Sequence, residues 1–128
     1  MEKIHTDLAP KAIGPYSQAW RSGNFIFCSG QTPLSAVTML IEGTTVTEQT
    51  TLVLNNLEAV LKVSGCDRSH VLKTSVFLKN FADFEKMNKA YESFFGEHKP
   101  ARTTVEVSRL PKDALVEIEC IAEVAKGS

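Results

Sequence analysis

Arg102 and Glu117 are the two residues whose types and positions in this sequence most directly suggest chemistry. Both lie in the segment PARTTVEVSRLPKDALVEIECIAEV, residues 100–124, whose two alternating runs predict two β-strands. A guanidinium can hold a carboxylate through two parallel hydrogen bonds, and a glutamate can accept a proton from water. The same pair can also form a cross-strand salt bridge, which contributes only about 0–1 kcal/mol at an exposed site. Pattern alone favours the salt bridge.

Alternation along the two strands predicts which face each side chain takes. In the first strand Val105 and Val107 share one parity, and Arg102 lies on the other, which is polar. In the second strand Glu117 lies on the parity opposite an apolar set. That set is Val116, Ile118, Cys120, Ala122 and Val124. If the two strands belong to one sheet, we therefore expect Arg102 and Glu117 to share the face that does not pack on the core.

The first half of the chain predicts a β-hairpin followed by a helix. Residues 17–30 form two strand-like runs around a turn at 22–24, where glycine and asparagine tolerate positive φ. Apolar residues then recur at helical spacing, with Thr47 available as the N-cap and Gly65 as the C-terminal stop. Between these elements, residues 39–42 are considered as a short strand.

The second half of the chain predicts a strand, a helix and the two C-terminal strands. Residues 71–79 alternate, and Asn80 is expected to cap a helix with an aromatic core stripe that ends at Gly96. This order predicts one α+β domain over residues 1–128. Two helices would lie on one face of a mostly antiparallel sheet of five or six strands.

The second face of such a sheet needs cover, because two helices cannot pack on both faces. Several of the predicted strands, above all residues 25–28, are apolar on both parities. We therefore expect that face to be buried against other copies of the chain in a closed ring.

Composition narrows the classes of function. Fourteen basic and fifteen acidic residues give a net charge of −1, which implies no bulk attraction to nucleic acid or to an anionic membrane. Three cysteines without a CxxC pair and three scattered histidines predict reduced thiols and no metal or cofactor. No apolar run approaches the roughly 18 residues of a membrane span. A cytoplasmic location is expected, and a mitochondrial one stays open because a trimmed precursor would look the same.

Four strings occur in a fixed order along almost the whole chain: AIGPYSQA at 12–19, SGQTPL at 29–34, DFEKMNKAYESFF at 83–95 and KPARTTVEVSRLPKDALVEIECIAEV at 99–124. Together they resemble the Rid (YjgF-like) family of enamine/imine deaminases, in its RidA subgroup. The resemblance implies a chorismate-mutase-like subunit and a homotrimer whose sheets form a central barrel, with active sites in the clefts between subunits. It also implies hydrolysis of 2-imino acids such as 2-iminobutanoate and 2-iminopropanoate to 2-keto acids and ammonia, without a cofactor or metal.

The resemblance also implies roles for individual residues. Arg102 would bind the substrate carboxylate with both arms of its guanidinium, which a lysine could not reproduce. Glu117 would position and deprotonate the attacking water. Tyr16, Ser29 and Gly30 would line the substrate cleft.

Two further positions and one segment need separate comment. Asn88 matches an asparagine that often lines the family site, although a buried structural amide is an alternative interpretation. Thr104 stands where many members carry a cysteine, so a thiol mechanism at this position is excluded, and its backbone N–H is the expected substrate contact. The segment SAVTMLIEG, residues 35–43, departs from the family's Asp/Gly-rich pattern and is interpreted as loop variation.

Two other functions stay open. The family includes trimers that bind small carboxylates without demonstrated turnover, and members described as RNA-cleaving translation inhibitors. Retention of both Arg102 and Glu117 favours the deaminase, because a carboxylate binder has less need of the glutamate. No histidine accompanies the motifs and no basic stretch is interleaved with aromatic residues, so a role on nucleic acid is not expected.

Overall fold

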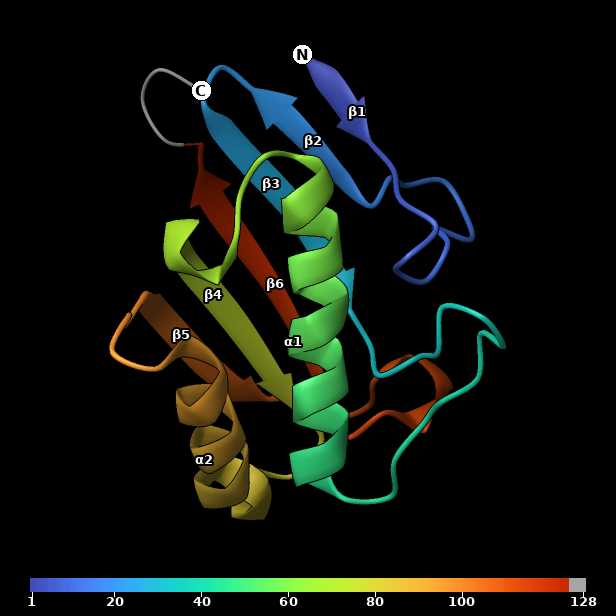
Figure 1. Cartoon of the computed structure of the whole chain (residues 1–128). Coiled ribbons are helices and arrows are strands. Elements are labelled where there is room, and N and C mark those ends of the chain that lie inside the picture. Colours follow the sequence, from blue (N-terminus) through green and yellow to red (C-terminus); the bar gives the residue numbers. More distant parts are fainter. Residues whose placement is uncertain (125–128) are drawn as a thin grey trace.

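A mixed six-stranded sheet and two helices on one of its faces make up the computed structural model, which describes residues 1–124 (Figure 1). The spatial order of the strands is β1-β2-β3-β6-β4-β5. All neighbours are antiparallel except β4 and β5, which are parallel and joined through a helix. The strands are β1 Glu2–Ile4, β2 Ala19–Ser22, β3 Phe25–Gln31, β4 Val71–Leu78, β5 Ala101–Glu106 and β6 Val116–Glu123.

The predicted fold class and the hairpin of β2 and β3 are confirmed, and the helices begin at residues other than those predicted. Helix α1 spans Val46–Val63. Its N-cap is Thr45, not Thr47, because the Thr45 hydroxyl accepts the Glu48 N–H while the Glu48 carboxylate accepts the Thr45 N–H. Helix α2 spans Phe84–Phe95.

The structure corrects two local predictions and adds one strand that was not predicted. Asn80 does not cap α2; its side chain accepts the Ala82 N–H and starts a short 3₁₀ turn, η2, Phe81–Asp83. Residues 39–42 are not a strand, because a single bridge between Leu34 and Ile41 is all the pairing they make. The N-terminal strand β1 was not predicted, because three residues are too short to show a period.

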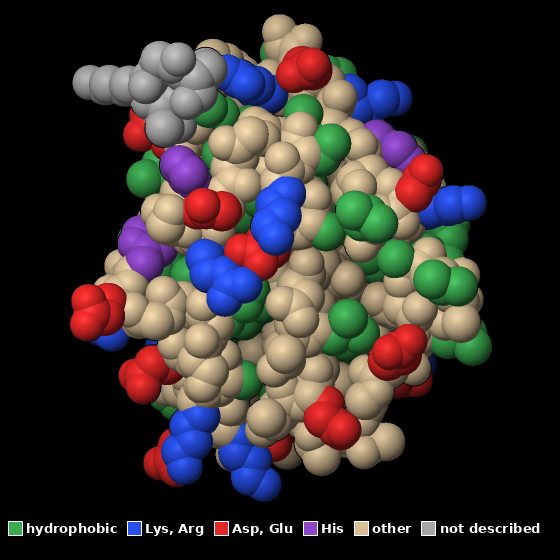
Figure 2. Space-filling view, in the orientation of Figure 1, with side chains coloured by type: hydrophobic (Ala, Val, Ile, Leu, Met, Phe, Trp, Pro, Cys, Tyr) green, Lys and Arg blue, Asp and Glu red, His purple; other side chains and the backbone are tan. Residues whose placement is uncertain are grey.

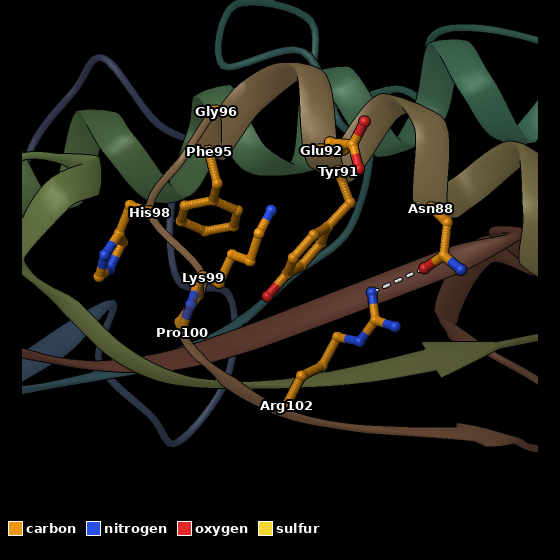
Figure 3. Close-up of a pocket in the computed structure, with 9 residues that line it drawn as sticks. All are labelled: Asn88, Tyr91, Glu92, Phe95, Gly96, His98, Lys99, Pro100 and Arg102. Carbon is orange, nitrogen blue, oxygen red and sulfur yellow. Dashed lines mark hydrogen bonds between the residues drawn. The ribbon is translucent and has the colours of Figure 1, made fainter.

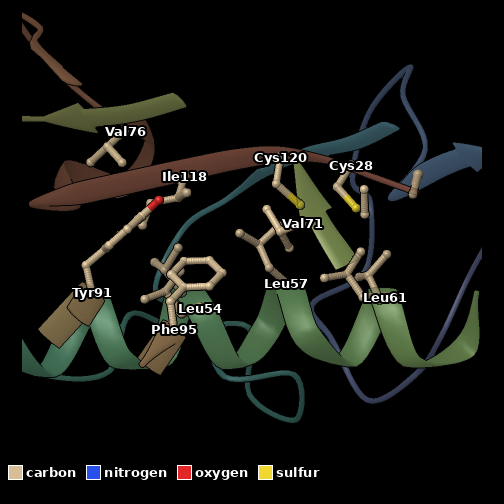
Figure 4. Close-up of a cluster of buried hydrophobic side chains, with 14 of the residues drawn as sticks. Cys28, Leu54, Leu57, Leu61, Val71, Val76, Tyr91, Phe95, Ile118 and Cys120 are labelled. Carbon is tan, nitrogen blue, oxygen red and sulfur yellow. The ribbon is translucent and has the colours of Figure 1, made fainter. Parts of the chain in front are cut away.

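The core lies between α1 and the central strands (Figure 4). Leu54, Leu57 and Leu61 of α1 point at the sheet, where Ile118 and Cys120 of β6 meet them. Each such leucine contributes about 1.5–3 kcal/mol by leaving water. This packing fixes β6 as the centre of the sheet and leaves its other side-chain parity, which includes Glu117, on the face away from the helices.

Helix α2 covers the β4–β5 side of the same face through Tyr91 and Phe95. The Tyr91 hydroxyl and the Thr74 hydroxyl of β4 lie 2.7 Å apart and share a hydrogen bond. Burial raises the pKa of Tyr91, so the phenol stays protonated and able to donate. Helix α2 is thereby held over the strand pair that carries Arg102.

The face away from the helices carries exposed aromatic and aliphatic side chains. Trp20 pairs with Phe27 across β2 and β3, and Phe27 pairs with Ile121 of β6. Val105 of β5, beside Phe77 of β4, extends the apolar surface to the far edge of the sheet. The second face of the sheet is therefore apolar, as the sequence predicts.

Arg68 ties the turn after α1 to both helices. Its Nε and Nη2 each donate to the Glu58 carboxylate at 2.7 Å, and its Nη1 donates to the Phe94 carbonyl at 2.7 Å. The guanidinium carbon lies 3.9 Å from the Phe94 ring centroid. Hydrogen bonds from Arg68 hold the pKa of Glu58 below its ordinary value.

We expect Arg68→Ala to lower the free energy of unfolding by about 1–2 kcal/mol at neutral pH, because it leaves the mostly buried Glu58 carboxylate without its partner; water around the partly exposed Arg68 keeps the effect modest. The folded-state pKa of Glu58 lies below its unfolded value, so the stabilisation is present above the unfolded pKa and is lost as pH falls through the folded one. Urea titrations of both proteins should therefore converge in acid. An equal difference at neutral and acid pH would show that packing on Phe94, not the ion pair, is what the substitution removes.

Candidate active site

Arg102 lies on the helix-covered face of β5, beneath α2 (Figure 3). Its register partner in β4 is the buried Thr74. Its Nη1 donates to the Asn88 Oδ1 at 2.7 Å, and its guanidinium carbon lies 4.8 Å from the Tyr91 ring centroid. Asn88 uses one of the five N–H donors, and within residues 1–124 the other four make no hydrogen bond, so the guanidinium retains donors with which to bind a carboxylate.

A cavity of about 470 Å³ adjoins this side chain. Asn88, Tyr91 and Arg102 line it, together with Lys99 at the loop before β5 (Figure 3). Its volume suits a small ligand. Lys99, Arg102 and the Asn88 amide are groups that can bind an anion here, and the Glu92 carboxylate, which also lines the cavity, opposes them in part.

Glu117 lies on the opposite face of the sheet. Its register partner in β4 is Phe77, whose other neighbour is Val105 of β5. The prediction that Arg102 and Glu117 share a face is therefore wrong. The reason is that β5 is an edge strand with apolar residues on the open face, so that Val105 points away from the helices and Arg102 toward them.

A second cavity of about 620 Å³ surrounds Glu117. Tyr16, Ser29 and Gly30 line it, as β3 lies beside β6. Ser29 is fixed by its hydroxyl, which donates to the Ser17 carbonyl at 2.6 Å. A Cβ on Gly30 would lie 3.0 Å from the Glu117 Cδ, so glycine is what allows the carboxylate to lie over this backbone.

The electrostatics of the second cavity favour a basic carboxylate. Burial raises the pKa of Glu117, and the neighbouring Glu119 carboxylate raises it further. A carboxylate of raised pKa holds a proton more strongly, which makes it a better general base at neutral pH. Glu119 lies two residues along β6 and lines the same cavity.

Thr104 lies outside the residues that line either cavity. It follows Arg102 on the helix-covered parity of β5, beside the buried Val76. Within residues 1–124 its hydroxyl is buried without a hydrogen-bond partner. The hydroxyl is thus enclosed, and the substrate contact expected from the Thr104 backbone N–H stays a prediction.

Several residues of the second cavity were not predicted from the sequence. They come from loops, where no hydrophobic period marks a position. They are Lys11, Ile13, Thr32, Leu34, Met39, Pro111 and Lys112.

Within residues 1–124 there is neither a cluster of metal-ligand side chains nor a helix able to span a membrane. Among residues 1–124 no three His, Cys, Asp or Glu side chains are grouped to hold a metal ion. Cys28, Cys66 and Cys120 are buried free thiols, and burial raises the pKa of Cys66. Within the same residues, none of the helices combines the length and the apolarity needed to cross a bilayer.

Known proteins resemble the chain over nearly its whole length. A family model described as Endoribonuclease L-PSP matches residues 6–124. A RutC family protein of Pyrococcus horikoshii is 52% identical over 94% of this chain and 96% of that protein. The chloroplastic Reactive Intermediate Deaminase A of Arabidopsis thaliana is 44% identical over 94% of this chain and 65% of its own length. The crystal structure of E. coli TdcF with bound serine has a TM-score of 0.93 and 39% identity, covering 98% of this chain and all of that one.

Proposed function

Since the chain belongs to the Rid (YjgF-like) family, we propose that it hydrolyses reactive 2-imino acids and their enamine tautomers to 2-keto acids and ammonia. 2-Iminobutanoate and 2-iminopropanoate are the proposed simplest substrates. The observation that carries the proposal is that one chain presents, in two cavities, a guanidinium with unused donors and a carboxylate of raised pKa. A cytoplasmic location is part of the same proposal.

The two groups act together only if two copies of the chain form the site. Arg102 and Glu117 project from opposite faces of one sheet, with β4 between their strands. No small ligand reaches both within a single chain. We therefore propose a homotrimer in which the apolar sheet faces meet and the Arg102 cavity of one copy closes over the Glu117 cavity of the next.

The expected mass of the particle in solution is three times 14.1 kDa. Burial of the Trp20 and Phe27 surface against other copies is the physical reason. Light scattering coupled to size exclusion at micromolar concentration measures it directly. A stable monomer that still hydrolyses imines would contradict both the trimer and the shared site.

The proposed mechanism follows from the chemistry of an imine next to a carboxylate. Arg102 holds the carboxylate and so fixes the electrophilic imine carbon in place. Glu117 takes a proton from a water molecule as its oxygen adds to that carbon. Glu117 passes this proton to the imine nitrogen, which gives a carbinolamine with a hydroxyl and an amine on one carbon. Glu117 then takes the hydroxyl proton and passes it to the amine; the carbon–nitrogen bond breaks, ammonia leaves and the 2-keto acid remains.

The direct test measures 2-keto acid released from an imine made in the assay by an amino-acid oxidase. Protein-dependent acceleration over the spontaneous decay of the same imine supports the proposal. A rate equal to the spontaneous one at every imine tested would overturn it. Free ammonia should appear in equal amount, because one carbon–nitrogen bond is broken for each keto acid formed.

A carboxylate-binding or regulatory trimer is the second candidate. The solved TdcF structure contains serine, which carries a carboxylate. This alternative predicts tight binding of 2-keto acids without hydrolysis. Against RNA cleavage, which the family model's description names, basic and acidic side chains are interspersed on the helix-covered face of this chain (Figure 2).

A further inference from the structure

The Glu117 cavity has an apolar wall to which the proposed reaction gives no role. Ile13, Leu34, Met39 and Pro111 supply it, from three separate loops. We propose that this wall receives the side chain of the imino acid, and that Met39 makes the site prefer aliphatic side chains larger than methyl. The inference rests on the proposed function and names the substrate class within it.

Met39 is held in place by the loop that carries it, residues 32–43. The Lys112 Nζ donates to the Met39 carbonyl at 3.2 Å, and the Met39 N–H donates to the Ser35 carbonyl at 2.9 Å. The Asn56 side chain in α1 donates to the Leu34 carbonyl at 3.0 Å. In Figure 1 this loop lies beside the segment before β6, and residues of both line the cavity. The Leu34 and Met39 part of the wall is therefore held by hydrogen bonds.

The backbone of Met39 has a conformation that its residue type disfavours. Its φ is 60°, in the left-handed region where glycine is usual. Such strain persists only where the surroundings enforce it, and it is concentrated at binding sites. Met39 is half-buried, whereas its loop neighbours Val37 and Leu40 are 90% and 64% exposed. A glycine would relieve this strain, so Met39→Gly removes the side chain without disturbing the backbone.

The chemistry of the wall selects an uncharged, flexible partner. The Glu117 and Glu119 carboxylates are balanced by the Lys11 and Lys112 ammonium groups of the same cavity, so its net charge does not select the side chain. The selection comes from the apolar wall, which gains free energy by burying an uncharged side chain. A thioether side chain adapts its rotamers to ligands of different shape. Imines derived from leucine or methionine fit this description better than those from alanine or glutamate.

The test replaces Met39 by glycine, which removes the side chain and suits the backbone. The measured quantity is the kcat/KM for 2-imino-4-methylpentanoate divided by that for 2-iminopropanoate. We expect Met39→Gly to lower this ratio at least about tenfold, the lower end of the discrimination that one methylene contact gives in an apolar pocket. Leu40→Ala is the matched control, since Leu40 is the next residue and lies outside the cavity lining. An unchanged ratio in Met39→Gly, or an equal fall in Leu40→Ala, overturns the inference.

A binding measurement separates this inference from the proposed function. If the wild type accelerates hydrolysis of neither imine, the deaminase proposal fails, and calorimetry with 4-methyl-2-oxopentanoate and pyruvate decides the role of the wall. Preference for the larger keto acid that Met39→Gly abolishes supports the wall. Equal preference in both proteins overturns it. Urea titration of Met39→Gly, expected to be at least as stable as the wild type, guards against a folding artefact.

Discussion

Glu117→Gln is expected to lower the rate of imine hydrolysis at least about 100-fold while leaving 2-keto acid binding nearly unchanged. The amide has almost the shape of the carboxylate but cannot take a proton from water. Steady-state hydrolysis measures the first effect and calorimetry with pyruvate the second. A parallel loss of binding and rate would mean that Glu117 holds the substrate and does not act on the water.

The pH dependence gives the same prediction a second readout. A general base works only when deprotonated, so kcat/KM should fall as pH falls through the raised pKa of Glu117. This acid limb should lie above the range of an ordinary glutamate. Glu119→Gln removes the neighbouring negative charge and should move the limb to lower pH without abolishing activity. If the acid limb does not shift in Glu119→Gln, the ionisation that it reports is not that of Glu117.

Stability should change in the opposite sense to activity. The folded-state pKa of Glu117 lies above its unfolded value, so its charge destabilises the fold above that pKa, and the cost is relieved as pH falls through it. Glu117→Gln should therefore unfold at slightly higher urea than the wild type at neutral pH. Such a variant, more stable and inactive, would show a residue kept for chemistry at the expense of stability.

The elements were predictable because each leaves a periodic signal. The stripe of Val53, Leu57 and Leu61 identifies α1, and alternation identifies β4 and β6. The face on which Arg102 lies was not predictable, because β5 has apolar residues on one parity and Arg102 on the other, and either parity could face the helices. Which parity meets α2 is set by the parallel pairing of β5 with β4, a tertiary choice that no local pattern records.

The candidate site was predictable only in part for a related reason. Tyr16, Ser29 and Gly30 were named through the family resemblance, and no period in the sequence marks them. Met39 and Lys112 are 73 residues apart and meet through a left-handed turn at each. Glycine or asparagine at these positions would predict such turns, whereas methionine and lysine do not. Loop contacts of this kind become visible only in three dimensions.

Mixing two inactive variants should restore activity, and this is the result that most sharply tests the shared site. Arg102→Ala alone should lose about tenfold to 100-fold in kcat/KM, because it removes a charge-assisted contact and the orientation that the contact gives. Arg102→Ala and Glu117→Gln chains that are unfolded together and refolded should form mixed trimers.

In such a mixture a site works when its Glu117 comes from an Arg102→Ala chain and its Arg102 from a Glu117→Gln chain. With equal amounts and random assembly, each condition holds half the time, so about a quarter of the wild-type activity should return. Refolding either variant with the double variant Arg102→Ala/Glu117→Gln supplies the control, because no site then gains both groups. If activity in the first mixture stays at the level of the two parent variants, the shared site is wrong. The reaction would then need Arg102 and Glu117 of one chain in the same site, which the opposite faces of its sheet do not allow.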